Sequence, residues 1–226
     1  VPSWTWSQGI TFTSATFSNA VTILQPPGGV NVGAGQQTVG PSLVEWGCTG
    51  ASGQACQSRV VIQSPNPATS LPLVFTNLGP VAGVTLRHDN NPIDGAFATL
   101  TSGTFASSIT LIPTIGIGPF PAPFLGGLIV GFKETPNSNP GPDTLHGTAD
   151  DCGFPEGAFK SPACPDIFSV PGLPSLVTPF SYDSDGAGPD APVNYALTAF
   201  AGGLTPLSAA ACIAAGMAPG CLGFVT

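Results

Sequence analysis

His88, Asp89 and Asn90 place an imidazole directly beside a carboxylate, a combination that can serve as a base or as a metal ligand. An active site needs several groups that converge, and the chain has one other histidine, His146, in a Pro- and Gly-rich stretch. No GxSxG nucleophile elbow surrounds any serine. We therefore predict no catalytic residues and no enzymatic activity. The three residues are interpreted as a strand end whose His and Asn side chains hydrogen-bond the following turn.

The segment from Asp183 to Gly186, with Asp190 close behind it, is the best candidate for a metal site. Carboxylates spaced around a glycine turn can offer several oxygens to Ca²⁺. The segment lacks the distal Glu of an EF-hand loop, and a solvated Asp-Gly turn explains the same residues without a metal. Calcium held by Asp183, Asp185 and Asp190 is the one cofactor considered, with a plain turn as the alternative.

An even number of cysteines in this chain indicates disulfides that form in an oxidising compartment. Six cysteines allow 15 pairings, and the sequence alone does not choose among them. We expect three local loops, because the cysteines form three close pairs: Cys48 with Cys56, Cys152 with Cys164, and Cys212 with Cys221. A zinc site is disfavoured because there is no CxxC and no histidine beside any pair.

Many short β-strands must hold these residues in place, because apolar and hydroxyl residues alternate along much of the chain. The alternation is strongest from Trp4 to Phe17, and residues 109–132 are predicted to form two strands joined by a Pro-rich loop. Other strands are predicted over residues 43–46, 58–63, 73–77, 81–88, 96–100, 107–112, 128–134, 175–182 and 193–200. This pattern is typical of an all-β sandwich or jelly roll.

One short helix is predicted near the C-terminus, where Ser208 can cap residues 209–215 and Gly216 can end the helix. Residues 137–166, rich in proline, are interpreted as a long excursion held by a disulfide. We therefore predict two parts, an N-terminal strand segment over residues 1–24 and a single sandwich domain over residues 25–226.

The chain carries little charge, with 4 basic and 12 acidic residues and a net charge of -8. Nucleic acid and anionic membrane surfaces are disfavoured as partners, because no cluster of Lys or Arg exists. No membrane-spanning helix is predicted, since prolines interrupt the most apolar stretch. Natural sheets shield their edges with Lys and other charges, which this chain mostly lacks. The favoured partner is therefore another copy of the chain.

The first 24 residues form a long, aromatic segment, and no acidic or basic residue precedes Glu45. A Pro- and Gly-rich hinge over residues 25–35 follows it. The segment is either an ordinary first strand or a donor strand that completes the sheet of a neighbour. Head-to-tail donation that does not close into a ring gives a filament. The candidate self-assembly residues are Trp4, Trp6, Ile10, Phe12 and Phe17.

Several short blocks of sequence, spread over nearly the whole chain, together resemble one bacterial family. The blocks are residues 4–6, 44–47, 86–93, 132–137, 164–168 and 221–226. The pattern resembles the THxN family of PEP-CTERM proteins, which are exported by Gram-negative bacteria. His88 and Asn90 occupy the namesake positions of that family. Arg87 stands where the family has Thr, and the C-terminal sorting tail of the family is missing.

The resemblance implies export, through a signal peptide expected to have been removed, and a role outside the cell or in a biofilm matrix. It brings no established biochemical activity with it. Our first hypothesis is an extracellular structural protein that self-assembles into a filament or matrix fibre by β-strand donation, with O-glycans on Ser and Thr residues that adjoin prolines. The alternative is a monomeric carbohydrate-binding or adhesion module, in which exposed Trp4, Trp6, Trp46 or Tyr182 would stack on a polysaccharide.

Overall fold

The protein is described by a computed structural model. The described residues are 2–19, 22–24, 37–47, 57–63, 68–69, 73–91, 93, 97–116, 121–134, 164–171, 175–186, 188, 190–200 and 202–225. Cys48, Cys56, Cys152 and His146 lie outside these residues, as does most of the predicted excursion. Within them the chain is mostly β-strand with one short helix, which confirms the predicted all-β class.

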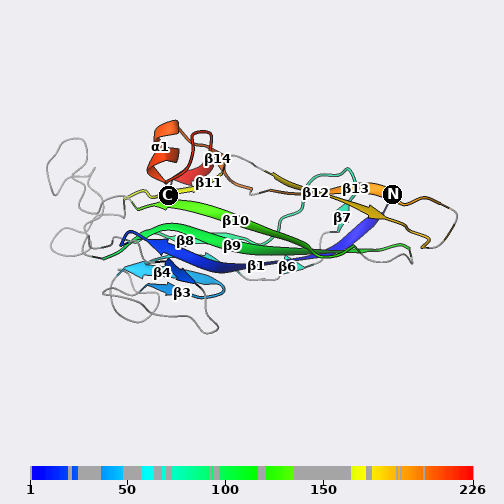
Figure 1. The fold of residues 1–226 in the computed structure, drawn as a ribbon, viewed down its shortest axis with the longest axis horizontal. Helices are drawn as coiled ribbons and strands as arrows, with labels where there is room; N and C mark the ends of the chain where they lie inside the picture. Colours follow the sequence, from blue (N-terminus) through cyan, green and yellow to red (C-terminus); the bar gives the residue numbers. More distant parts are fainter. Residues whose placement is uncertain are drawn as a thin grey trace.

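The strands and the helix are arranged in an elongated molecule in which the longest strands run along the long axis (Figure 1). In chain order the elements are β1 (Ser3–Phe17), β2 (Thr22–Leu24), β3 (Thr38–Val39), β4 (Leu43–Gly47), β5 (Gln57–Ile62), β6 (Ala68–Thr69), β7 (Val74–Phe75), β8 (Leu86–Asp89), β9 (Leu100–Pro113), β10 (Phe124–Lys133), β11 (Ile167–Val170), β12 (Ser175–Tyr182), β13 (Val193–Phe200), β14 (Thr205–Pro206), α1 (Ala209–Ala214) and β15 (Leu222–Val225).

The largest sheet is antiparallel, and β1 is its last long strand, with only short strands on its outer side. Its strand order is β14-β15-β11-β10-β9-β1-β2, and β6 and β7 also pair with β1. Because side chains alternate along a strand, Trp4, Trp6 and Phe12 point to the same face of the sheet. A register irregularity between Phe12 and Ser14 then moves Ala15 and Phe17 onto that buried face.

A second sheet, in the order β3-β4-β5-β8, packs against one end of the large sheet and makes the molecule a β-sandwich there. The main core lies between the two sheets. Its buried residues are Phe12, Ala15, Phe17, Val39, Val44, Trp46, Val60, Ile62, Ile93, Leu100, Phe105, Val130, Phe132, Phe168 and Val170. At the same end, α1 lies on the other side of the long strands (Figure 1).

A smaller core lies at the opposite end of the molecule, under the β12–β13 hairpin (Figure 1). Trp4 is buried there with its ring edge-on to the rings of Phe180, Tyr182 and Tyr195, at centroid distances of 5.6, 5.1 and 5.7 Å. Trp6 and Leu111 complete the buried part of this core. The hairpin pairs with no other strand among the described residues, so aromatic packing holds it on the large sheet.

The predicted helix is confirmed, with a small change at its end. Ser208 is the N-cap, and its side chain accepts a hydrogen bond from the Ala211 amide. The helix ends at Ala214, and Gly216 follows with a φ of 73°, which glycine adopts without strain. The predicted Cys212–Cys221 disulfide is present and ties the helix to the region just before β15. No helix in the described part of the chain is long and apolar enough to cross a membrane.

Most predicted strands are present, and the differences fall at their ends. The Pro-rich loop between β9 and β10 is in the predicted place. Of residues 81–88, predicted as one strand, only the part from Leu86 onward pairs with a neighbour. Of residues 96–100, only Leu100 belongs to a strand, as the first residue of β9. The short strands β3, β6, β11, β14 and β15 were missed.

Candidate functional site

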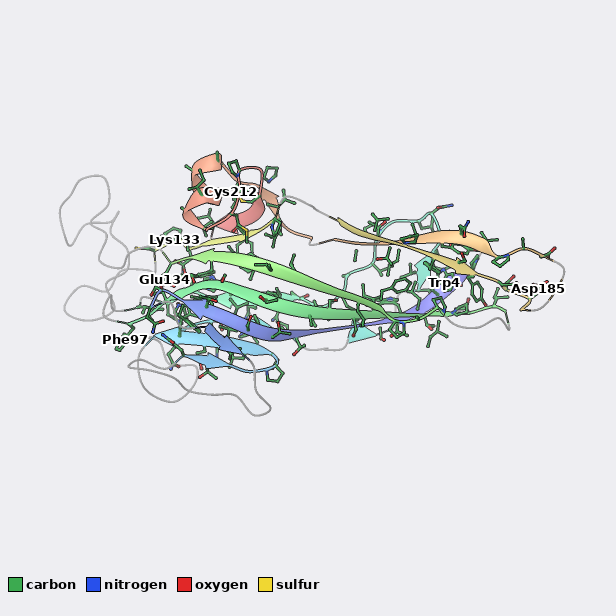
Figure 2. The ribbon with its side chains drawn as sticks, viewed as in Figure 1. Trp4, Phe97, Lys133, Glu134, Asp185 and Cys212 are labelled. Atoms are coloured by element: carbon green, nitrogen blue, oxygen red, sulfur yellow. A yellow bond between two sulfur atoms is a disulfide. The ribbon has the colours of Figure 1, made fainter. Side chains whose placement is uncertain are left out.

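A group of polar and aromatic side chains connects the two sheets of the sandwich, and we call it the bridging cluster. Trp46 comes from β4 and His88 from β8, both in the smaller sheet. Asn90 directly follows β8, and the other side chains come from β10 of the large sheet, from the residue after it and from the residue before β11. The members of the cluster are Trp46, His88, Asn90, Phe132, Glu134 and Asp166. Figure 2 shows Glu134 beside Lys133, at the end of β10.

The contacts of the bridging cluster run from one sheet to the other. Trp46 Nε1 donates a hydrogen bond of 3.0 Å to Glu134 Oε2. His88 Nε2 lies 3.7 Å from Asp166 Oδ2, and the two side chains are 2% and 1% exposed. The His88 ring stacks on Trp46, and the Phe132 ring packs edge-on against both. The cluster thus joins the smaller sheet to β10 and to the residues just before β11.

Burial shifts the pKa values of the titratable groups in the bridging cluster. Burial lowers the pKa of His88 to about 4, although the negative charge of Asp89 opposes the shift. Burial and the nearby Asp166 carboxylate raise the pKa of Glu134 to about 8, against the hydrogen bond from Trp46 and the charge of Lys133. At neutral pH His88 is therefore uncharged and Glu134 is mostly protonated. The contact between His88 and Asp166 is then not an ion pair.

Asn90 and Asn91 extend the connection between the elements in a way that differs from the predicted local turn. Asn90 Nδ2 donates a 2.7 Å hydrogen bond to the carbonyl of Cys164, 74 positions away in the sequence. Asn91 Nδ2 donates to the Gln57 carbonyl at 2.8 Å, at the start of β5. These amides therefore join distant segments, because short polar side chains can satisfy buried backbone carbonyls.

The neighbouring Asp89 faces two arginines instead of taking part in the bridging cluster. Arg59 Nε lies 2.6 Å from one carboxylate oxygen and Arg87 Nε lies 2.8 Å from the other. Burial opposes ionisation of Asp89, but the hydrogen bonds from Arg59 and Arg87 outweigh it and lower its pKa. The carboxylate next to His88 is thus engaged with arginines, which removes the pairing that would make the imidazole a base.

The bridging cluster can do structural work but offers little to a substrate. Its imidazole and its two carboxyl groups are all nearly inaccessible to solvent. The described grooves of the surface are lined by other residues, on β1, β9, β10 and β12 and the segment before β10. The cluster is best understood as a set of buried contacts that fixes how the two sheets sit on each other.

The three aspartates predicted to bind calcium lie in the turn between β12 and β13. Figure 2 shows Asp185 at the far end of the molecule from Glu134. A side-chain hydrogen bond with Asp183 raises the pKa of Asp185, and the charges of Asp183 and Asp190 act in the same direction. No group of three or more His, Cys, Asp or Glu residues in the described ranges could hold a metal ion. Calcium binding by Asp183, Asp185 and Asp190 stays a prediction.

The leading segment lies inside its own domain in the single chain. β1 pairs with β9 along most of its length, and its other edge pairs with β2, β6 and β7. Trp4, Trp6, Phe12 and Phe17 are buried, and Ile10 packs against the main core. Donation of these residues to a neighbour would therefore require the strand to be exchanged, because no part of β1 projects from the sheet.

The aromatic residues predicted as exposed platforms for a polysaccharide are buried, so that prediction was wrong. Trp46 is fully buried, and Trp4, Trp6 and Tyr182 are each less than one-tenth exposed. Tyr182 also donates a hydrogen bond from its hydroxyl to the Ile115 carbonyl at 3.2 Å. The four rings build the two cores, because large aromatic side chains contribute most when they leave water.

Part of the edge of β10 has no partner strand among the described residues. β10 pairs with β9 from Phe124 to Gly131, but on its other side it pairs with β11 only from Gly131 to Lys133. We call the stretch from Phe124 to Val130 the β10 edge. No described strand pairs with its outer side. On the β10 edge, Leu125 is 79% exposed and Ile129 is 57% exposed.

A groove lies where the β10 edge begins. It has a volume of about 480 Å³ and is lined by residues 121–125 on one side and residues 178–181 of β12 on the other. Phe124 and Phe180 touch across it, with ring centroids 5.3 Å apart. None of the lining residues is charged. The β10 edge therefore ends in an uncharged hollow between two strands.

Sequence reasoning identified His88 and Asn90 but missed their partners. It assigned no site role to Glu134 or Asp166 and considered Trp46 only as a platform for a polysaccharide, since no local spacing connects residues so far apart. A signal was nevertheless present. Each of these residues lies in one of the short blocks that carry the resemblance, and four of the six blocks contribute to the bridging cluster: residues 44–47, 86–93, 132–137 and 164–168. These four blocks share the junction between two sheets, whereas Trp4 and Trp6 of another block lie in the smaller core.

Comparison of the chain with family models, with curated proteins and with solved structures finds no match.

Proposed function

We propose that this chain is an extracellular structural protein that self-assembles into a filament or matrix fibre through pairing of β-strands between copies. The observation that carries the proposal is the β10 edge, an uncharged strand edge with exposed apolar side chains and no partner among the described residues. An edge of this kind is a template for another strand.

The low charge of the strands supports the same proposal. No acidic or basic residue occurs between Asp94 and Lys133, so both β9 and the whole β10 edge lack the charges that normally keep edges apart. The strands β12 and β13 are also uncharged, and Val177 and Val193 are exposed on them, whereas the acidic residues of this hairpin lie in its turn. A monomer with these surfaces loses apolar exposure when it associates.

An extracellular location is proposed together with the assembly. Cys212 and Cys221 are joined, Cys164 is also disulfide-bonded, and no described cysteine is free. Disulfides persist in oxidising surroundings such as the outside of a cell. Membership of the THxN family would agree with this location.

Two routes to assembly can be separated, because β1 occupies its own sheet. In one route the β10 edge and the hairpin pair with other copies while β1 stays in place. In the other route β1 is exchanged, as in strand donation. Ser7 and Thr110 are register partners on β1 and β9, on the solvent-facing side of the sheet. A Ser7→Cys, Thr110→Cys double variant can therefore lock β1 into its own sheet with a disulfide.

The test is negative-stain microscopy and sedimentation of the purified protein, first unaltered and then locked. Polymers in the unaltered protein support the proposal, and a protein that remains monomeric at high concentration refutes it. Polymers that persist in the oxidised, locked protein indicate pairing of edges. Polymers that appear only after reduction indicate exchange of β1. The Ser7→Cys single variant controls for the substitution itself.

A monomeric carbohydrate-binding module is not favoured by any specific observation, since the rings proposed to stack on sugars are buried. We also propose that the protein is not an enzyme. The burial of His88, Glu134 and Asp166 supports this, because a substrate would have to reach groups that are sealed between two sheets.

A further inference from the structure

We infer that the β10 edge pairs antiparallel with the β10 edge of a second copy about a two-fold axis at Gly127. This inference rests on the proposed function, and it assigns the strand, the register and the direction of one contact. In this register Phe124 faces Val130 of the second copy, Leu125 faces its Ile129 and Gly126 faces its Leu128. The same pairs recur on the other side of the axis.

The pairing places compatible side chains opposite each other. Pairing with β9 assigns the faces: Phe124, Gly126, Leu128 and Val130 lie on the core side, and Leu125, Gly127 and Ile129 on the outer side. On the outer side, each highly exposed aliphatic side chain meets the other one of the second copy. Cross-strand aliphatic pairs of this kind stabilise sheets.

On the core side, the same register sets a small residue against a large one. Leu128, which is 36% exposed, lies opposite Gly126 of the second copy, so the side chain has room over the bare backbone. Val130 of the second copy, whose side chain is buried in its own main core, comes next to Phe124, beside the uncharged groove between the start of β10 and β12.

The open stretch of β10 has defined ends. Beyond Val130, the edge is already occupied by β11, from Gly131 to Lys133. Before Phe124 stand Pro121 and Pro123, which lack the backbone N–H that a ladder needs. The seven residues in between are centred on Gly127, so a two-fold antiparallel pair about this residue uses the whole stretch in both copies.

Two β10 edges placed side by side do not repel each other electrostatically. Two like-charged residues placed opposite each other destabilise a strand pair, but the β10 edge carries no charge. The nearest charged residue in the sequence is Lys133, which lies outside the paired stretch and alongside β11. Nothing in the edge therefore opposes a second identical edge.

Cysteine cross-linking tests the register directly. Residues that face each other across the axis have Cα atoms about 4.5–5.5 Å apart, within reach of a disulfide. A Gly127→Cys variant should convert almost entirely to a covalent dimer under mild oxidation. A Cβ at Gly127 meets only the Phe105 carbonyl, at 3.4 Å, so the variant should fold. An Ala106→Cys variant is the matched control, because Ala106 pairs with Gly127 on β9 and its copies would lie about 14 Å apart.

A charge exchange tests the direction of the strands. Leu125→Lys or Ile129→Glu alone should weaken dimerisation at least tenfold. The double variant should recover it, because each new lysine then faces a glutamate of the second copy. Both positions are exposed in the monomer, so folding should be unchanged, which circular dichroism checks. A double variant as weak as the single ones, or equal cross-linking of both cysteine variants, would overturn the inference.

The two proposals fail in different ways. If the unaltered protein polymerises but Gly127→Cys yields no covalent dimer, this register is wrong while self-assembly stands. If the unaltered protein stays monomeric at every concentration, both proposals fail.

Discussion

The buried Glu134 carboxyl should make the unaltered protein less stable as the pH rises above neutral, and a Glu134→Gln variant should not show this loss of stability. The pKa of Glu134 is raised from 4.5 to about 8, so between these values the folded protein holds a proton that the unfolded chain has released. The free energy of unfolding therefore falls as the pH rises through this range. His88 acts in the opposite direction, because its pKa is lowered from 6.5 to about 4.

The two groups leave one range in which Glu134 dominates. Between pH 4.5 and 6.5 the losses from Glu134 and the gains from His88 largely cancel. Above pH 6.5 the titration of His88 in the unfolded chain is nearly complete, so Glu134 lowers the free energy of unfolding as the pH rises. The slope declines as the pH approaches 8, and the expected net loss from pH 6.5 to 8 is about 1 kcal/mol.

Denaturant unfolding at pH 5.5, 6.5, 7.3 and 8, followed by tryptophan fluorescence, measures this loss. The Glu134→Gln variant keeps an oxygen that can accept the hydrogen bond from Trp46 but cannot ionise. Its stability should change little over the same range. Parallel pH profiles for the two proteins would refute the reasoning, because they would show that Glu134 is already ionised at neutral pH or is not buried.

Three further predictions concern the contacts that hold the molecule together. Asn90→Ala should lower the free energy of unfolding by about 1–2 kcal/mol, because the Cys164 carbonyl loses its hydrogen-bond donor. The control Asn194→Ala, at an exposed site, should change the free energy of unfolding by less than about 0.5 kcal/mol. Thermal unfolding of the two variants tests the difference. Trp4→Ala should cost about 3–5 kcal/mol and expose the β12–β13 hairpin to limited proteolysis, and unchanged cleavage there would contradict the role of the smaller core. Replacing both Cys212 and Cys221 by Ala should cost roughly 2–3 kcal/mol, since the disulfide closes a short loop, and a protein as stable as the original in calorimetry would show that α1 packs without it.

The strands could be predicted wherever the alternation of side chains is strong. β1, β12 and β13 follow it over eight or more residues, and they lie where the pattern put them. β11 and β15 are only four residues long, and their pattern is too brief to stand out from the neighbouring cysteines and prolines. Val81 and Val84 pack against the smaller core without belonging to a strand, so their apolar side chains were mistaken for part of a strand pattern.

The bridging cluster could not have been predicted from local sequence. Its residues come from four separate stretches, and their contacts depend on how two sheets are stacked. The error over the tryptophans has a related cause. In a chain with so few charges, the alternation of apolar and polar side chains identifies the strands but does not show whether an aromatic face is buried or exposed to solvent. Here other elements pack on both ends of β1 and bury its aromatic side chains.

β1 passes through both cores of the molecule, from Trp4 under the hairpin to Phe17 between the two sheets. A pull along the long axis would therefore load the many hydrogen bonds between β1 and β9 side by side instead of opening them one after another. In a fibre, each subunit would then carry tension through a continuous ladder, and neither core could come apart without straining the other. The same strand that makes the fold cooperative would give such a fibre its mechanical strength.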